Sequence, residues 1–381
     1  MGRRSAAPRV SQGSRAAPAR PAQRAAGVVA AALLVGLAAA ACSGGSTSVA
    51  DTTTTVSPTT TTAPPPPTTR AAPVTTVPPT TTTTTTEPPP LAPLTGLVAA
   101  AEITRPAVVV KIDNHRNATP QWGLNQADVV FEEIVEGGIT RFAAVFHSND
   151  LATIGPIRSA RTGDFDLLRN LNKPIFVNSG ANEIVWRLLR REDAIVVSDA
   201  NISAVFSRSP DKHAPHNLVT STALVYAARP GEGGTPPALF RYHEPGRPLA
   251  NSSRASGVDI DFGTLDVSYR WDAPLGGYAR THYGRPHNDF AGERIAPANL
   301  IVQLVRYGQS AGDRYTPEPR LIGSGDALVF SGGRMVEADW RRASSTAVTE
   351  YRDAADGRIV LLEPGPTWVA LTRVGTAVVV E

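Results

Sequence analysis

Seven charged side chains between positions 132 and 164 have the types and spacing to bind an anion or to transfer a proton. They are Glu132, Glu133, Glu136, Arg141, Arg158, Arg161 and Asp164. Arg158 and Arg161 flank the expected start of a helix, where backbone N–H groups are free and the helix carries partial positive charge. Two guanidinium groups beside such a helix end would bind phosphate or carboxylate through paired hydrogen bonds. The sequence therefore predicts an anion-binding site, with Arg141 as a third donor from a neighbouring strand.

The same charges also allow a structural interpretation and a catalytic one. In the first, the arginines pair with Glu132, Glu136 and Asp164 and hold the layers of the fold in register. In the second, one of these carboxylates acts as acid or base while the arginines stabilise developing charge. Catalysis requires Arg158, Arg161 and a carboxylate to meet in a solvent-open cleft. The structural interpretation predicts that the same side chains are buried and paired with one another.

A second polar cluster contains His282, His287 and Asp289, within the sequence THYGRPHND. Histidine and aspartate ligate zinc, but neither this spacing nor that of His213 and His216 matches an established zinc motif. We therefore expect no metal site. His287 and Asp289 are expected in a loop, where they hydrogen-bond to the backbone.

Motifs for covalent catalysis and for nucleotide cofactors are missing from the sequence. It contains no G-x-S-x-G elbow, no Walker-type phosphate loop and no dinucleotide fingerprint. Ser159 lies between two arginines, but a serine at a helix start usually caps the helix. The only cysteine, Cys42, has a different role, described next. We therefore expect no cofactor, and the sequence favours a binding protein over an enzyme.

The first 41 residues have the layout of a secretory signal peptide. Six arginines and no acidic residue precede Cys42, and residues 25–41 are uncharged and apolar. The sequence Ala-Ala-Ala-Cys is similar to the lipobox of bacterial lipoproteins, in which the cysteine thiol is acylated and the leader is removed. The alternative is an uncleaved membrane anchor, at the short end of the spanning range of about 17–25 residues. Both interpretations place the remainder outside the cytoplasm, on the outer face of the membrane.

Residues 42–92 are expected to be a lipid-anchored, disordered tether. Ser46–Pro90 consists mostly of Thr and Pro, which bury too little apolar surface to offset the entropy of ordering. Without the leader arginines, the 31 remaining basic residues face 34 acidic ones. Because this balance is slightly negative, we expect no nucleic-acid partner.

Residues 93–228 predict short helices between strands. A Gly137-Gly138 pair indicates a hairpin, Thr162 or Asp164 is an expected helix cap, and Glu183–Arg191 is an expected helix. The expected strands are Arg105–Asp113, Ala127–Glu136, Thr140–His147, Lys173–Asn178 and Ile195–Ser198. This half therefore has the pattern of a layered sheet with helices.

Residues 258–381 follow a Pro-, Gly- and Ser-rich connection over residues 229–257 and have the period-two pattern of strands. The expected strands are Val258–Phe262, Val267–Trp271, Leu300–Tyr307, Ala327–Phe330, Met335–Trp340, Ile359–Leu362, Trp368–Thr372 and Ala377–Val380. The overall prediction is an α+β fold, with layered sheets and helices in the N-terminal half and a mostly antiparallel β C-terminal half.

Several motifs occur in an order that resembles the YerB-like lipoproteins, a family with N- and C-terminal domains of unknown function (DUF3048-type). The motifs include PLTG from Pro93, EGGITRF from Glu136, IGPIRSAR from Ile154, NLIVQ from Asn299 and PGPTW from Pro364. The resemblance covers nearly the whole chain after the tether. It implies a two-part α+β architecture and a lipoprotein address, and it brings no known reaction.

These observations lead to two expectations about function. The first is a non-catalytic binding or scaffolding lipoprotein of the cell envelope, anchored to the membrane through its N-terminal lipid and bound to a wall polymer or an envelope protein. The alternative is an envelope enzyme, a hydrolase or transferase, that acts on an anionic or phosphorylated wall polymer.

Overall fold

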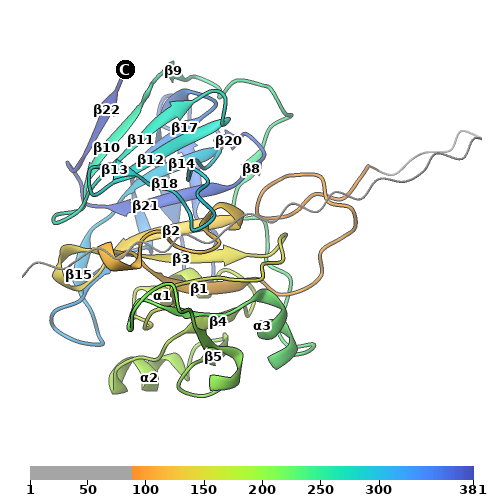
Figure 1. Ribbon diagram of the computed structural model, residues 1–381. Coiled ribbons are helices and arrows are strands. Elements are labelled where there is room, and N and C mark those ends of the chain that lie inside the picture. The colour runs from red at the N-terminus through yellow and green to blue at the C-terminus, as the bar shows by residue number, and fades with distance from the viewer. Residues whose placement is uncertain (1–87) are drawn as a thin grey trace, which may run out of the picture. The chain divides into compact units, whose positions relative to one another are not determined.

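Strands dominate the computed structural model, which describes residues 88–381 (Figure 1). The predicted signal peptide, Cys42 and nearly all of the predicted tether lie outside the described residues. Within the described part, no helix combines the length and the apolar character needed to cross a membrane.

An eleven-stranded sheet runs through both predicted halves of the molecule. Its strands are, in spatial order, β19 (Glu350–Asp353), β18 (Arg334–Arg342), β17 (Gly323–Ser331), β14 (Asn299–Leu304), β21 (Thr367–Thr372), β2 (Val129–Ile134), β3 (Thr140–Phe146), β1 (Val108–Asp113), β4 (Ile175–Asn178) and β5 (Ile195–Ser198), and β9 (Ser253–Arg254) also pairs with β18. β21 pairs in parallel with both β14 and β2. One strand from the end of the chain therefore joins the two halves, and the C-terminal half is not purely antiparallel.

A five-stranded antiparallel sheet covers one face of the large sheet (Figure 1). Its order is β13 (Arg285–Pro286), β12 (Gly277–His282), β11 (Asp266–Asp272), β10 (Gly257–Asp261) and β22 (Ala377–Val380). Val258, Val267 and Tyr269 of this sheet share a buried cluster with Phe142 and Trp368 of the large sheet. The two sheets are therefore layered face to face, as in other sheet packings.

The large sheet separates two apolar cores, because its side chains alternate between faces. Val108, Val110 and Ile112 of β1 join the core shared with the small sheet, whereas Val109 joins the core on the opposite face. Continuous β-branched runs suit strands that are buried on both faces. The same alternation decides on which face each charged side chain of β1, β2 and β3 lies.

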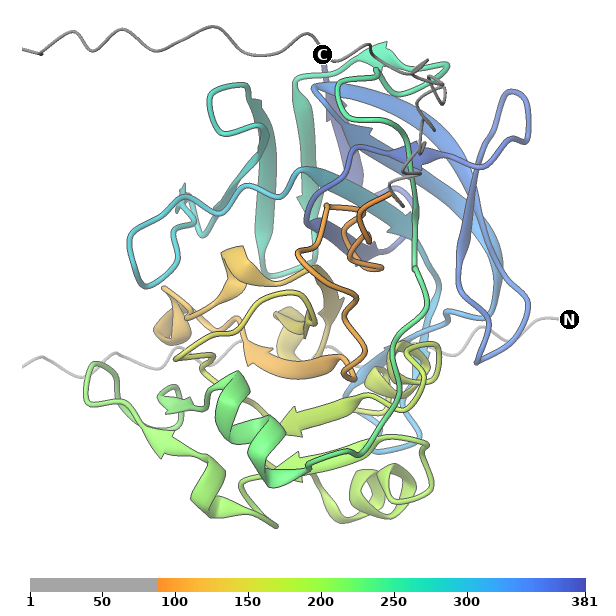
Figure 2. The same cartoon turned by 90° about the vertical axis from the view of Figure 1, so that its right-hand side faces the viewer.

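Helices are short and few among the described residues. They are α1 (Asp164–Leu168), α2 (Glu183–Leu189) and α3 (Thr222–Ala228), with 3₁₀ turns η1 (Arg116–Ala118), η2 (Leu124–Gln126), η3 (Glu136–Gly138) and η4 (Ser203–Val205). Leu168 of α1 and Val185 of α2 join the core on the face opposite the small sheet. The segment after α3 then runs as an extended stretch toward the C-terminal half (Figure 2).

Three two-stranded pairs complete the described secondary structure. They are β15 (Tyr307–Gln309) with β16 (Pro317–Pro319), β8 (Arg241–Tyr242) with β20 (Leu361–Leu362), and β6 (Ser207–Arg208) with β7 (Leu218–Val219). The β8–β20 pair is parallel. It connects the stretch after α3 to the C-terminal half.

The hairpin expected at Gly137-Gly138 is confirmed, because β2 and β3 pair antiparallel on either side of it. Both glycines have positive φ, at 74° and 72°, which glycine adopts at little cost. The expected caps of α1 are wrong. The N-cap position is Gly163, which provides no side-chain cap. Thr162 instead contacts Ser310 and Glu318 through its hydroxyl group.

Candidate functional site

Polar side chains gather at the carboxyl ends of the parallel strands β1, β4 and β5. β1 ends at Asp113, and β4 ends at Asn178. The loop before α1 crosses this edge, since the Arg158 N–H donates to the Lys111 carbonyl oxygen at 2.8 Å and the Ser179 N–H donates to the Arg158 carbonyl oxygen at 3.0 Å. In sheets with parallel strands, ligands bind preferentially outside the carboxyl ends. We call this region the carboxyl edge.

Asp113 contacts two side chains at the carboxyl edge, one arginine and one histidine. Arg158 Nε lies 2.9 Å from Asp113 Oδ2, and His216 Nδ1 donates to the same oxygen atom at 2.7 Å. The two nitrogen atoms are therefore at most 5.6 Å apart. The Asp113 side chain is 1% exposed, compared with 23% for Arg158 and 12% for His216. The His115 ring stacks on the His216 ring at 4.7 Å.

The outer nitrogen atoms of this pair remain available to a ligand. No hydrogen bond from a described residue engages Nη1 or Nη2 of Arg158, or Nε2 of His216. None of these three atoms is among the fully buried polar atoms, so all three reach solvent-accessible space. Asp113 thus contacts the inner side of both groups, through a hydrogen bond from His216 and an ion pair with Arg158 that lacks hydrogen-bond geometry, and their outer side stays open.

Glu136 engages the other two predicted arginines. Arg141 Nη2 donates to Glu136 Oε1 at 2.8 Å, and Arg161 Nε donates to Glu136 Oε2 at 3.0 Å. Burial would raise the pKa of Glu136, but the Arg161 hydrogen bond and the two guanidinium charges outweigh it and lower that pKa to about 2. Burial and the nearby charge of Arg161 lower the pKa of Arg141, whose Nε is buried without a hydrogen-bond partner in the described part of the chain.

Asp164 lies deeper, in a buried triad with Lys111 and Glu133. Lys111 Nζ donates to Asp164 Oδ1 at 2.6 Å and also contacts Glu133. Burial raises the pKa of Glu133 to about 7, although the Lys111 charge opposes the shift. Asp164 also accepts the Arg161 N–H, and α1 has only five residues. The helix end is therefore not the anion site that the sequence predicted.

Glu132 contacts none of the three predicted arginines, because its side chain points to the opposite face of β2. There it accepts a hydrogen bond from Arg280 Nη2 at 2.7 Å, with both side chains essentially inaccessible. Arg280 comes from β12, so this ion pair links the two sheets. Adjacent positions 132 and 133 thus belong to different networks, as the two-residue period of a strand requires.

The histidine cluster extends this buried network. Arg280 Nη1 donates to His287 Nδ1 at 2.6 Å, and His287 Nε2 donates to Gln121 Oε1 at 2.8 Å. Burial and the Arg280 charge hold the pKa of His287 well below its ordinary value, and the same causes lower the pKa of His282 to about 2. The expectation that His287 bonds to backbone is wrong for its side chain. Asp289 does accept a backbone N–H, from Glu293 at 3.0 Å.

Within residues 88–381, no three His, Cys, Asp or Glu side chains come together in a way that could hold a metal ion. The residue that sequence reasoning missed is Asp113, which ends a predicted strand and carries no motif. His216 was noted only for its spacing. A carboxylate at the end of a buried strand is a usable signal for such a site.

Comparison with known proteins identifies the family. A family model described as the N-terminal domain of a protein of unknown function (DUF3048) matches residues 94–234, and the corresponding C-terminal domain matches residues 258–369. The Bacillus subtilis (strain 168) protein named "Putative lipoprotein YerB" is 33% identical over 291 residues, which cover 73% of this chain and 85% of that protein. The chain belongs to the DUF3048 family.

A solved structure of a relative also matches this DUF3048 chain. The crystal structure of the YerB protein from Bacillus subtilis matches with a TM-score of 0.67 and 27% sequence identity. The match covers 76% of this chain and 99% of the crystallised one. The resemblance to YerB-like lipoproteins seen in the sequence is therefore confirmed.

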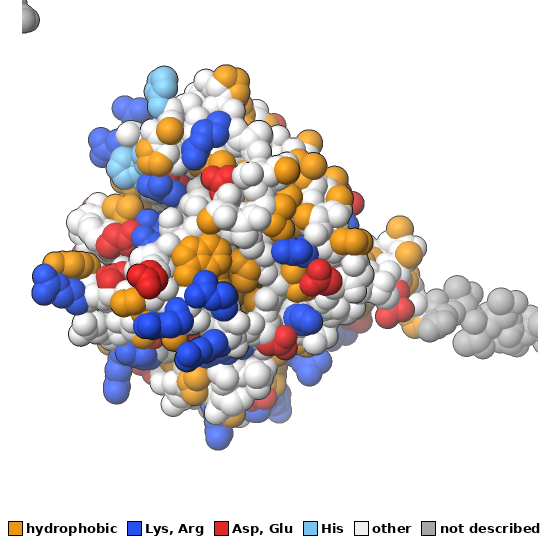
Figure 3. All heavy atoms as spheres, turned by 90° about the horizontal axis from the view of Figure 1, so that it is seen from below, with side chains coloured by type: hydrophobic (Ala, Val, Ile, Leu, Met, Phe, Trp, Pro, Cys, Tyr) orange, Lys and Arg blue, Asp and Glu red, His pale blue; other side chains and the backbone are white. Residues whose placement is uncertain are grey.

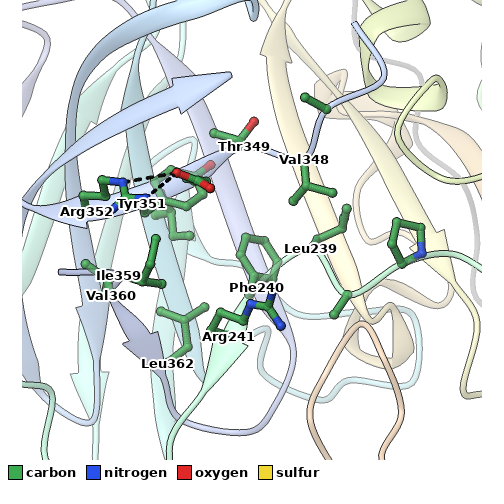
Figure 4. Close-up of a pocket in the computed structure, with 15 residues that line it drawn as sticks. Leu239, Phe240, Arg241, Val348, Thr349, Tyr351, Arg352, Ile359, Val360 and Leu362 are labelled. Carbon is green, nitrogen blue, oxygen red and sulfur yellow. Dashed lines mark hydrogen bonds and ion pairs between the residues drawn. The ribbon is translucent and has the colours of Figure 1, made fainter. Parts of the chain in front are cut away.

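The surface of this DUF3048 protein has two further features. On the face formed near α2 and β5, basic side chains surround a hydrophobic patch, with acidic side chains among them (Figure 3). A pocket of about 660 Å³ is lined by residues 237–241 and 347–352, together with apolar side chains of the C-terminal half (Figure 4). No sequence motif marks this pocket, because its walls are extended segments outside the predicted strands.

Proposed function

We propose that this chain is a non-catalytic recognition protein of the cell envelope, held at the outer face of the membrane by a lipid on Cys42. It binds an anionic group, a phosphate or a carboxylate, at the carboxyl edge. The lipidation part of the proposal is supported by the signal-peptide pattern and by the name of the Bacillus subtilis relative. The recognition part depends on the geometry around Asp113.

The observation that carries the proposal is the pairing of Arg158 and His216 with one oxygen atom of Asp113. The buried carboxylate orients both side chains, so little conformational entropy is lost when a ligand arrives. The two Nη groups of Arg158 form a planar fork that suits two oxygen atoms of one anion. His216 Nε2 lies beside this fork and adds a further polar contact.

The charge balance of the carboxyl edge favours an anion. The side chains of three arginines form ion pairs there with only two carboxylates among the described residues, Asp113 and Glu136. The Arg141 Nε, buried and without a hydrogen-bond partner among the described residues, adds an unsatisfied donor to the cluster. An unpaired buried donor is costly, and a bound anion lowers that cost by its electrostatic interaction with the group.

The carboxylates expected to act as acid or base are poorly suited to that role. Glu132 and Asp164 are buried in ion pairs, and the pKa of Glu136 is lowered to about 2 while two arginines engage it. A general acid or base works best with a pKa near the operating pH. These features support binding rather than proton transfer by the predicted residues.

A second candidate function is an envelope enzyme that acts on an anionic polymer, and one observation favours it. Asp113 and His216 form a carboxylate–imidazole pair with the outer imidazole nitrogen open, which is the arrangement of a general base. The two candidates differ in product formation, since only the enzyme releases fragments of the polymer.

The test is incubation of full-length protein with isolated wall fractions, scored for retention and for released material. Arg158→Gln should weaken retention at least about tenfold, since charge-assisted hydrogen bonds contribute about 1.5–3 kcal/mol. Arg270→Gln is the matched control, because Arg270 also pairs with an aspartate, Asp259, but far from the carboxyl edge.

Equal retention of Arg158→Gln and wild type would refute recognition at the carboxyl edge. If the wild type releases wall fragments and His216→Gln does not, the second candidate function, catalysis, is correct and non-catalytic binding is refuted. Thermal unfolding of each variant checks that a loss of retention does not come from a loss of folding.

A further inference from the structure

The pocket in Figure 4 has two extended walls that run along the chain rather than a ring of side chains. One wall is Pro237–Arg241, in the stretch that leads into β8. The other is Ala347–Arg352, which leads into the edge strand β19. The pocket has a volume of about 660 Å³, within the range of about 300–1,000 Å³ that is usual for ligand sites.

Both walls carry backbone groups that the fold does not use. Among residues 88–381, no hydrogen-bond partner is found for the backbone N–H and C=O groups of Leu239, Phe240, Val348 or Thr349. Backbone groups without a protein partner bond to water in the free protein. Because successive residues of an extended segment direct their N–H and C=O groups to opposite edges, one residue of each adjacent pair can face the hollow. A ligand that bonds to both walls must offer donors and acceptors in alternation.

The floor of the pocket is apolar and continuous with one of the two cores. Leu239, Phe240, Tyr351, Val360 and Leu362 belong to the core on the face opposite the small sheet. In Figure 4, the side chains of Val348, Leu239 and Phe240 lie next to one another between the two walls. An occupant therefore has apolar groups that point toward this floor.

A smaller hollow of about 20 Å³ adjoins the floor and shares Phe240 and Tyr351 with the pocket. Asn170 lines this hollow, and its Oδ1 is buried without a hydrogen-bond partner in the described structure. The space fits a hydroxyl group or a single water molecule. The hollow thus holds one buried acceptor next to the floor of the pocket.

The rim carries positive charge. Arg241 is exposed and forms no ion pair with any residue from 88 to 381, whereas Arg352 is paired with Glu350. An acidic group on the occupant would find its charge partner at Arg241.

We propose that this pocket binds an extended peptide segment of a partner protein, with apolar side chains toward the floor and an acidic residue at Arg241. An extended peptide is the ligand whose backbone donors and acceptors alternate along both edges, so it can bond to both walls at once. The protein's own Thr/Pro-rich segment fits this role poorly, because proline has no N–H to donate. The pocket lies away from the carboxyl edge and requires neither Arg158 nor His216.

The test is selection of binders from a phage-displayed library of random peptides against the full-length protein in detergent micelles. Selected peptides should carry alternating apolar residues and an acidic residue. Their synthetic forms should slow amide hydrogen exchange at residues 237–241 and 347–352. Arg241→Glu should weaken binding at least about tenfold, whereas Arg187→Glu, at an exposed position of α2 that does not line the pocket, should leave it unchanged.

Three outcomes would overturn the inference: no enriched peptide, exchange protection confined to another part of the surface, or equal binding by Arg241→Glu and wild type. Arg158→Gln separates this site from the carboxyl edge, because it should leave peptide binding at wild-type strength. Loss of peptide binding in Arg158→Gln would contradict the independence of the two sites.

Discussion

Replacement of Arg280 by methionine should strongly destabilise the fold, because it leaves a buried carboxylate without its counter-charge. Arg280 and Glu132 are 0% and 1% exposed, and their closest contact is 2.7 Å. In Arg280→Met, Glu132 keeps only neutral donors, the hydroxyl groups of Thr140 at 2.7 Å and Tyr269 at 3.4 Å and the amide of Asn114 at 3.3 Å. Removal of one partner of a buried ion pair costs about 3–5 kcal/mol. For the roughly 290 residues of the folded part, with an unfolding entropy of about 2.1 cal/mol/K per residue, that loss lowers Tm by roughly 5–8 °C.

The matched control is the double variant Glu132→Leu with Arg280→Met, in which no charge remains unpaired. Replacement of both partners by apolar residues is often neutral or stabilising, so most of the lost stability should return. Thermal unfolding followed by circular dichroism measures both variants, at low and at high salt. The single-variant loss should not depend on salt, because buried pairs are little screened. A loss below about 1 kcal/mol, or a double variant no more stable than the single one, would refute the argument.

Three further predictions follow from individual residues. Folding raises the pKa of Glu133 from 4.5 to about 7, so the folded state binds the proton more tightly than the unfolded state. The free energy of unfolding therefore falls as pH rises through this window, by on the order of 3 kcal/mol. Glu133→Gln should flatten this pH dependence in melting curves recorded at a series of pH values. Gly96 has φ +66°, and an added Cβ would lie 2.4 Å from Tyr242 Cγ. Gly96→Ala should therefore lower the free energy of unfolding, measured with urea, by about 1–3 kcal/mol. Cys42→Ser should move the protein from the membrane pellet to the aqueous fraction, and an unchanged distribution would contradict lipid anchoring.

Local pattern was enough to predict most strands. The β-branched runs at Ile195–Ser198 and Ala377–Val380 match β5 and β22 residue for residue. β12 was not predicted as a strand, because its sequence GYARTH has no β-branched run and buries Arg280 and His282 in a polar network formed by distant segments. α3 was also missed, although Ser221 is a recognisable cap that accepts the Leu224 N–H.

Only some residues of the candidate site were predicted from the sequence. Arg158 and Arg161 both precede α1 instead of flanking its start. The structural interpretation named Glu136, the partner of Arg161, but not Asp113, the partner of Arg158. Asp113 and His216 approach Arg158 only through tertiary pairing, across 45 and 58 residues of chain. The strand period, by contrast, already implied that Glu132 and Glu133 point to opposite faces, so one of them had to leave the cluster.

The position of β21 has a consequence for folding if the chain is exported, as we propose. A protein that is exported starting from its N-terminus must remain unfolded until its last segment has crossed the membrane. Here the strand that fills the gap between β14 and β2 is encoded close to the C-terminus. Until it arrives, the edges of both neighbouring strands lack a partner, and premature closure of the sheet is disfavoured. A product truncated before Thr367 would keep two open edges and become a target for envelope proteases.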